Sequence, residues 1–339
     1  MSPADDPRVA SFHDGLRIVS LLPSATEIVA ALGLAGALVG RSHECDFPEG
    51  VERLPACTEP MIDPGAPSDE IHGSVSDLLA RALSVYRVDS ERLRTLRPTH
   101  VVTQVQCDVC AVSLEQVADA LADWAAAPTP RAETTGERPE LVALDASSFD
   151  GVFADVRRVG QALSVSERAE ELVASMRTRV RQIAEATASA PERPRVAAIE
   201  WLSPLMTAGN WMPELIELAG GRNLFGEAGR HSPRIEWSDV VAADPDVVLV
   251  FPCGFSLERT AAEAGLLASL PGWDRFRAVR EGRVYLCEGN QYFNRPGPRL
   301  VETLEILAEV FHPSRFTFGH EGEGWMRLDA AKRGTRSRK

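Results

Sequence analysis

The chain has 339 residues, 44% of them apolar and 25% charged, which is typical of a soluble globular protein with room for two domains. The formal net charge of -13 argues against nucleic-acid binding, because an acidic surface repels phosphate groups. No segment has the roughly 18 consecutive apolar residues of a membrane-spanning helix, so we expect no membrane insertion. Residues 1–8 carry acids and prolines where a signal peptide has basic and apolar residues. This predicts a cytoplasmic protein, with a periplasmic or cell-surface location as the alternative if the true start differs.

The first half of the chain alternates short apolar strands with helices. A helix after the first strand is predicted to begin with the capping-box sequence Ser24-Ala-Thr-Glu27 and to end at Gly33. A second capping sequence, Ser113-Leu-Glu-Gln116, follows the third strand. The predicted strands are 17–22, 38–40, 100–103 and 141–144. Strands that alternate with helices predict a parallel sheet with helices on both faces.

A long helical stretch at 149–189 separates the two halves. Beyond Ala169 its apolar residues recur at the spacing of one buried helical face. A new cap at Ser164-Val-Ser-Glu167 predicts that two helices meet near residue 164. Such a connector is stiff, so it permits a small change of angle between two lobes and resists wide hinge opening.

The second half repeats the alternation. A short helix carries Pro213 in its first turn and ends at Gly220-Gly221. The predicted strands are 195–201, 247–250 and 284–286. The predicted fold is therefore α/β, with two Rossmann-like lobes whose parallel sheets are joined by a long connecting helix. The predicted parts are a disordered N-terminus at 1–16, an N-terminal lobe at 17–148, the connecting helix at 149–189, a C-terminal lobe at 190–326 and a basic disordered tail at 327–339.

Ligands of open parallel sheets bind beyond the carboxyl ends of the strands. The segments that follow the predicted strands are rich in cysteine, aromatic, amide and glycine residues, which suits a large flat ligand. The candidate ligand-binding residues are His43, Glu44, Cys45, Asp46, Gln104, Cys107, Cys110, Trp201, Trp211, Cys253, Phe255, Asn290, Tyr292, Phe293 and Arg295.

The cysteines allow more than one interpretation. Thiolate and imidazole ligands suit zinc or iron, so His43, Cys45, Cys107 and Cys110 are also candidate metal ligands. The pair Cys107 and Cys110 would also suit thiol chemistry at a helix start, or plain packing as small apolar residues. Dinucleotide, phosphate-loop, nucleophile-elbow and zinc-protease motifs are absent from the sequence. We therefore expect a protein that is not an enzyme, with no catalytic residue.

Several segments resemble a known family. Arg17–Ile28, Val39–Pro48 and Asn290–Leu300 resemble the cobalamin and iron-siderophore substrate-binding proteins of ABC transporters. Gln106–Ser113 and Gly209–Glu214 resemble the branch of that family described as cobalamin-binding proteins. The resemblance covers most of the chain and implies a class III substrate-binding fold. It also implies that cobalamin or a related corrinoid binds in the cleft between the two lobes.

The resemblance further implies an ABC permease as partner, docked through one acidic residue at a helix start in each lobe. Glu91 matches the first of these, while Ser238 stands at the second with Asp239 beside it. Glu44 stands where the family has an aromatic residue, and Tyr292 matches another. We expect a monomeric binding protein. The alternatives are a cytoplasmic corrinoid-processing or metal-handling enzyme that uses the cysteines, and a transporter component for another metal chelate.

Overall fold

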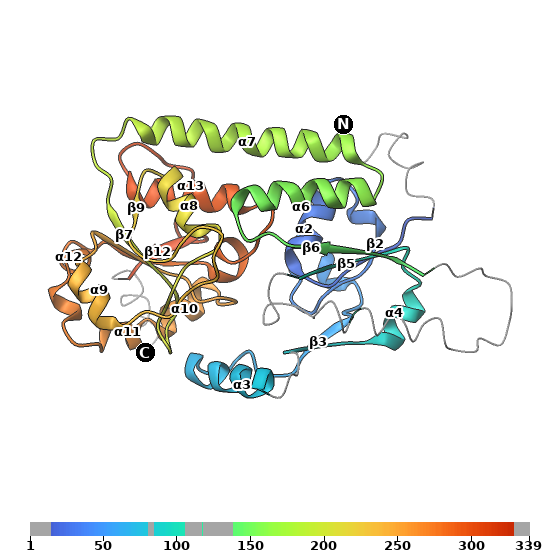
Figure 1. The fold of residues 1–339 in the computed structure, drawn as a ribbon, viewed down its shortest axis with the longest axis horizontal. Helices are drawn as coiled ribbons and strands as arrows, with labels where there is room; N and C mark the ends of the chain where they lie inside the picture. The colour runs from blue at the N-terminus through green and yellow to red at the C-terminus, as the bar shows by residue number, and fades with distance from the viewer. Residues whose placement is uncertain (1–14, 81–84, 106–116, 118–137, 329–339) are drawn as a thin grey trace, which may run out of the picture. The chain divides into compact units, whose positions relative to one another are not determined.

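The computed structural model describes residues 15–80, 85–105, 117 and 138–328. These residues belong to two compact units, each built around its own sheet (Figure 1). The first unit comprises Met1–Gly65, Gly73–Ala146 and Phe153–Val173, and the second comprises Ala66–His72, Ser147–Val152 and Ala174–Lys339. The predicted disordered ends fall mostly outside the described residues, and so does the predicted cap at Ser113–Gln116.

A parallel sheet with the strand order β2-β1-β5-β6 forms the centre of the first unit. Its strands are β1 (Ile18–Ser20), β2 (Leu38–Gly40), β5 (His100–Gln104) and β6 (Glu140–Leu144). Val19 of β1 lies opposite Val101 of β5, and both side chains are fully buried. Apolar residues on both faces of a covered parallel sheet give continuous apolar runs. The four strands accordingly lie where the sequence predicts them.

Helices and a small second sheet surround these strands. The small sheet is antiparallel and pairs β3 (Thr58–Pro60) with β4 (Tyr86–Val88). The helical segments are α2 (Pro23–Ala31), η2 (Ala35–Ala37), η3 (Val51–Arg53), α3 (Ser68–Ala80) and α4 (Ser90–Leu96). Asp89 caps α4 by accepting a hydrogen bond from the backbone N–H of Arg92 at 2.9 Å. The helix ends at Arg97, whose φ of 44° is left-handed, immediately before Pro98.

The capping box predicted at Ser24–Glu27 is wrong. Helix α2 begins earlier, at Pro23, because proline has a φ that suits a first helical turn and lacks an N–H that would need a cap. Ser24 therefore lies inside the helix, and its buried hydroxyl has no hydrogen-bond partner among the described residues. The predicted stop is correct: Gly33 follows the helix with a left-handed φ of 77°.

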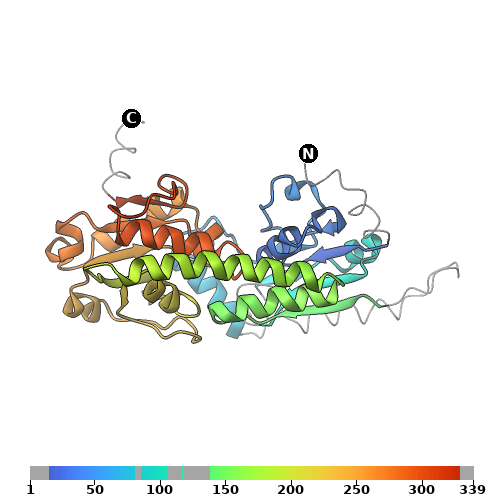
Figure 2. The ribbon, with the colours of Figure 1, turned by 90° about the horizontal axis from the view of Figure 1, so that it is seen from above.

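Two helices form the stretch predicted at 149–189. They are α6 (Phe149–Ala162) and α7 (Ser166–Ala188), and they run side by side in both views (Figures 1 and 2). The chain turns between them at Ser164, where φ is 58° and near which the sequence predicts that the two helices meet. A Cβ on Gly160 would lie 2.4 Å from the Cβ of Ala169, so glycine permits the close approach of the two helices. None of the helices in the described part of the chain is long and apolar enough to cross a membrane.

The second unit has a mixed sheet with the order β12-β11-β10-β7-β8, in which β9 also pairs with β7. Its strands are β7 (Arg195–Trp201), β8 (Met206–Thr207), β9 (Arg222–Asn223), β10 (Val247–Val250), β11 (Val284–Cys287) and β12 (Trp325–Arg327). The three central strands β7, β10 and β11 are parallel, as predicted. The antiparallel strands β8 and β12 are additions at the two sides of the sheet.

The helices of the second unit include one that is mostly buried. The helical segments are α8 (Met212–Leu218), α9 (Trp237–Ala243), α10 (Leu257–Glu263), α11 (Gly265–Ala268), η4 (Trp273–Arg275), α12 (Arg277–Arg280), the π-helical turn η5 (Gly289–Phe293) and α13 (Leu300–Phe311). Helix α13 is the buried one. Helix α9 ends at Asp244 with a left-handed φ of 40° before Pro245, which repeats the end of α4. The predicted α/β class is confirmed.

Candidate functional site

In the first unit, polar residues gather beyond the carboxyl end of β2. The backbone N–H of His43 donates to Oγ1 of Thr58 at 3.0 Å, and Nδ1 of the same imidazole lies 2.7 Å from that oxygen. The Thr58 hydroxyl in turn donates to Oγ of Ser42 at 3.0 Å. The ring of Tyr86 lies 5.1 Å from the imidazole. The small sheet β3–β4 thus supplies both contacts that hold His43, and neither residue was among the predicted site residues.

Arg41 fixes the main chain around His43. Its guanidinium donates to four backbone carbonyl oxygens, those of Ser42 (2.8 Å), Glu52 (3.0 Å), His43 (3.1 Å) and Leu54 (3.2 Å). Burial lowers the pKa of His43 below its ordinary value of 6.5, and the positive charge of Arg41 lowers it further. The imidazole is therefore neutral at pH 7 and sits on a rigid loop.

The other predicted residues of the first unit differ in accessibility. Glu44 is half-buried, and its Oε1 accepts from the Tyr86 hydroxyl at 2.9 Å. Cys45 is buried, with its Sγ 3.0 Å from Oγ1 of Thr26. Gln104, the last residue of β5, is buried as well, whereas Asp46 is exposed. His43 and Glu44 are thus the partly exposed members of this group, together with the exposed Asp46.

A predicted metal site finds no support in the described residues. They contain no group of three or more histidine, cysteine or acidic residues that could hold a metal ion. Cys45 is engaged with Thr26, and burial raises the pKa of Cys57, the residue before Thr58, to about 11, so that its thiol is protonated at neutral pH. Cys107 and Cys110, the other predicted ligands, lie outside the described residues.

In the second unit, aromatic residues follow β7 and β10. Trp201 ends β7 and is half-buried, with its ring 5.5 Å from that of Phe255 in an edge-on arrangement. The Arg259 guanidinium lies 3.7 Å above the Phe255 ring, a cation–π contact. Phe255 itself is buried, and Cys253 is half-buried. Of Trp201 and Phe255, Trp201 is therefore the aromatic residue with surface accessible to a ligand.

Glu288 organises the loop after β11. Its carboxylate caps η5 by accepting from the backbone N–H groups of Asn290 (3.1 Å) and Gln291 (3.2 Å). It also accepts from the N–H of Leu257 at 2.5 Å, in the segment after β10. Burial raises the pKa of Glu288. One carboxylate therefore ties together the two loops that carry Phe255 and Asn290.

The same two loops touch through their main chains. A Cβ on Gly289 would lie 2.2 Å from the carbonyl oxygen of Pro252, so no larger residue fits there. The Asn294 side-chain amide donates to the carbonyl oxygens of Phe251 (3.1 Å) and Gly289 (3.0 Å). This contact fixes η5 against the end of β10.

The remaining predicted residues lie on or near η5. Tyr292 is half-buried, with the Arg299 guanidinium 5.2 Å from its ring centre. Arg295 is buried and donates to Oδ1 of the half-buried Asn290 at 3.0 Å. Phe293 and Trp211 belong to the core, where the indole N–H of Trp211 donates to the Phe293 carbonyl oxygen at 2.9 Å. Of the predicted aromatic residues in this unit, Trp201 and Tyr292 thus keep part of their surface accessible.

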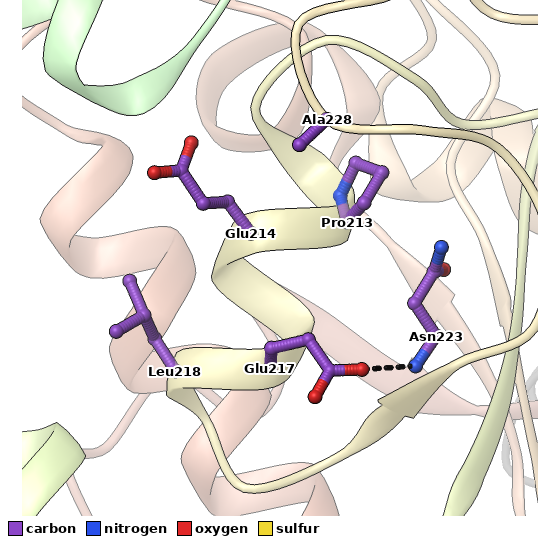
Figure 3. Close-up of a pocket in the computed structure, with 6 residues that line it drawn as sticks. All are labelled: Pro213, Glu214, Glu217, Leu218, Asn223 and Ala228. Carbon is purple, nitrogen blue, oxygen red and sulfur yellow. Dashed lines mark hydrogen bonds between the residues drawn. The ribbon is translucent and has the colours of Figure 1, made fainter.

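A shallow pocket of about 520 Å³ lies elsewhere in the second unit, along α8 (Figure 3). Its lining residues are Pro213, Glu214, Glu217, Leu218, Asn223 and Ala228. The Glu217 carboxylate already accepts from the backbone N–H of Asn223 at 3.0 Å and from Arg193 at 2.5 Å. The negative charge of Glu217 is therefore already paired within the protein. None of the predicted site residues lines this pocket.

Comparison with known proteins defines the family. Residues 18–290 match the family model described as periplasmic binding protein, and the chain belongs to this family. An uncharacterized ABC transporter substrate-binding lipoprotein of Bacillus subtilis (strain 168), YvrC, is 25% identical over 308 residues, which cover 88% of this chain and 81% of the relative. A cobalamin-binding protein of Halobacterium salinarum (strain ATCC 29341 / DSM 671 / R1) is 33% identical over 173 residues, 49% of this chain and 45% of the relative.

Solved structures show the same fold. The periplasmic heme-binding protein RhuT from Roseiflexus sp. RS-1, in its apo form, is similar with a TM-score of 0.64 at 24% identity. The match covers 88% of this chain and 99% of that one. The class III substrate-binding fold expected from the resemblance is therefore confirmed.

The prediction of a cytoplasmic protein is wrong. The family model is described as periplasmic, and the Bacillus relative is a lipoprotein of the ABC transporter type. Both findings point to a place outside the cytoplasm. The composition of residues 1–8, on which the prediction rested, does not report where the protein functions. The relatives named above are described as binding proteins and not as enzymes, which agrees with the expected lack of catalysis.

Proposed function

We propose that the protein is the substrate-binding component of an ABC transporter and that its ligand is a corrinoid such as cobalamin. The family and the substrate-binding lipoprotein of Bacillus support the transport role. The 33% identity with a cobalamin-binding protein, over about half of the chain, supports the ligand. Another metal chelate is the alternative ligand, because the fold is shared with proteins that bind heme. We also propose that the protein acts as a monomer.

The observation that carries the proposal is the set of accessible groups beyond the strand ends. Trp201 and Tyr292 offer aromatic faces in the second unit, and the half-buried Asn290, two residues before Tyr292, carries an amide whose Oδ1 accepts from Arg295. A corrinoid presents a flat apolar macrocycle with amide side chains at its rim. Aromatic faces match the macrocycle, and amides match the rim because they both donate and accept hydrogen bonds. In the first unit, the partly exposed His43 stands on a loop whose main chain is hydrogen-bonded by Arg41.

Equilibrium dialysis of the purified protein with cyanocobalamin and with cobinamide tests this proposal. We expect saturable binding, weakened about tenfold by Trp201→Ala or Tyr292→Ala, which corresponds to about 1.4 kcal/mol for each aromatic contact. Leu266→Ala is a suitable control, since this exposed apolar residue lies on α11 and away from the strand ends. Saturable binding of heme or a ferric siderophore without binding of either corrinoid would replace the corrinoid by the alternative chelate.

Docking to a permease is the second part of the proposal. Glu91 lies in the first turn of α4 and Asp239 in the first turn of α9, and both are exposed. The two helices end in the same way, with a left-handed residue followed by proline. An acidic residue in the first turn of a similar helix in each unit, although Ser238 and not Asp239 is the exact counterpart of Glu91, supports a permease that contacts each unit through one carboxylate.

A further inference from the structure

The arrangement around His43 determines which nitrogen of its ring carries the proton. A threonine hydroxyl has one hydrogen to donate and two lone pairs that accept. The hydrogen of Thr58 goes to Ser42, and one lone pair accepts the backbone N–H of His43. The other lone pair is left for Nδ1, 2.7 Å away, so Nδ1 is the protonated nitrogen. Nε2 then carries the lone pair of the neutral ring.

Nε2 has no hydrogen-bond partner among the described residues. Within the described part of the chain, the contacts of the His43 side chain are those with Thr58 at Nδ1 and with the ring of Tyr86. His43 is partly exposed, and the Arg41 guanidinium holds the main chain that carries its ring. A histidine whose Nδ1–H is held by an oxygen acceptor is the usual form of a metal ligand, because the hydrogen bond orients the ring and makes Nε2 more basic.

The neighbours of His43 in the sequence are less suited to coordinate a metal. Oε1 of Glu44 accepts the hydrogen bond of the Tyr86 hydroxyl. Cys45 is buried and its sulfur lies against the Thr26 hydroxyl. His43 is thus the residue of this loop that combines an oriented ring, partial exposure and a lone pair without a protein partner among the described residues.

We propose that Nε2 of His43 is an axial ligand to the metal at the centre of the bound macrocycle. Cobalt in a corrinoid accepts imidazole nitrogen, as does iron in other tetrapyrroles. Thr58 is then a positioning residue, which acts through the Nδ1 hydrogen bond. This inference rests on the proposed corrinoid-binding function. It adds a coordinate bond between Nε2 of His43 and the metal of the bound ligand.

Electron paramagnetic resonance of bound cob(II)inamide tests the coordinate bond. Cobinamide lacks the nucleotide base of cobalamin, so an axial nitrogen must come from the protein. We expect each cobalt line to appear as a triplet from nitrogen-14, and as a doublet after labelling of the histidines with nitrogen-15. His43→Ala should remove the splitting, and His43→Gln serves the same purpose if the alanine variant does not fold. His100→Ala, at the opposite end of β5 in the same unit, should retain it.

The outcomes separate this inference from the proposed function, because binding is measured independently by dialysis. Binding of cob(II)inamide without nitrogen splitting, or splitting that persists in both His43 variants, would overturn the axial ligand and leave corrinoid binding intact. No binding of any corrinoid would overturn both.

Thr58→Val keeps His43 but removes the acceptor for Nδ1, and we expect binding about tenfold weaker with a reduced split signal. Unchanged affinity and splitting in this variant would refute the role of Thr58. A nine-line signal from bound heme nitrosyl, in which an axial protein nitrogen splits each line of the nitrosyl triplet again, with no split signal from the corrinoid, would assign the ligand to iron in place of cobalt.

Discussion

Gly289→Ala tests whether contact between the loops after β10 and β11 supports the ligand site. The added methyl carbon would lie 2.2 Å from the Pro252 carbonyl oxygen and 3.0 Å from the carbonyl carbon and oxygen of Phe251. These are all main-chain atoms, so no side-chain rotation can relieve the overlap. The loops must separate by about 1 Å to restore ordinary contact distances. Overpacking that requires such a backbone shift costs typically 1–3 kcal/mol, and we expect about 3 kcal/mol because no flexible atom can give way.

Urea unfolding followed by circular dichroism measures this loss directly. A loss of about 3 kcal/mol corresponds to roughly 6–12 °C in melting temperature for a domain of 150–250 residues. We also expect the dissociation constant for cobinamide to rise about tenfold, or by 1.4 kcal/mol, since η5 carries Asn290 and Tyr292. Gly265→Ala is the matched control, because no atom lies within 4 Å of its added Cβ. If Gly289→Ala unfolds and binds like the parent protein, the loops are not locked as described.

Two further changes probe the second unit and the docking surface. The hydrogen bond from His320 to Glu305, at 3.0 Å, raises the pKa of His320 above 6.5. The stability that this contact provides is therefore fully present below pH 6.5 and is lost as pH rises through the raised pKa. Urea unfolding at pH 6 and pH 8 should show a loss of about 1 kcal/mol that His320→Gln abolishes, and an equal loss in the variant would refute the assignment. Reversing the charges of Glu91 and Asp239 to lysine should lower transport at least about tenfold while dialysis shows unchanged ligand affinity. Glu171→Lys on the exposed side of α7 should transport normally, and normal transport by the double variant would exclude the proposed docking residues.

The elements that sequence predicts well are those whose pattern is local. Strand β10 (Val247–Val250) is a continuous apolar run, which is visible without any knowledge of its neighbours. Strands β8 and β9 have two residues each, too few for any periodic signal, so they escaped prediction. The start of α2 was misplaced because Ser24-Ala-Thr-Glu27 fits a capping box, although the fixed φ of Pro23 already begins the helix there.

The candidate site was only partly visible in the sequence for a different reason. His43 could be predicted because it follows a strand, but its partners Thr58 and Tyr86 come from a small sheet whose pairing is not local. Aromatic residues were the other difficulty. Trp211 and Phe293 belong to the core, and an aromatic side chain suits a core as well as a ligand wall. Burial, which distinguishes the two roles, depends on packing across the whole unit.

The left-handed residues before Pro98 and Pro245 are positions where the backbone conformation lowers the free energy of unfolding. A left-handed conformation costs an L-residue roughly 1 kcal/mol, and glycine avoids most of that cost. Asp244 uses its side chain to accept the backbone N–H of Arg277 at 3.0 Å, so its identity has a local reason. Arg97 is exposed, and Arg97→Gly should raise the free energy of unfolding by about 0.5 kcal/mol. A more stable variant obtained in this way would leave every proposed ligand-binding residue unchanged, and would suit immobilisation on a sensor chip for measuring the proposed ligand in culture media.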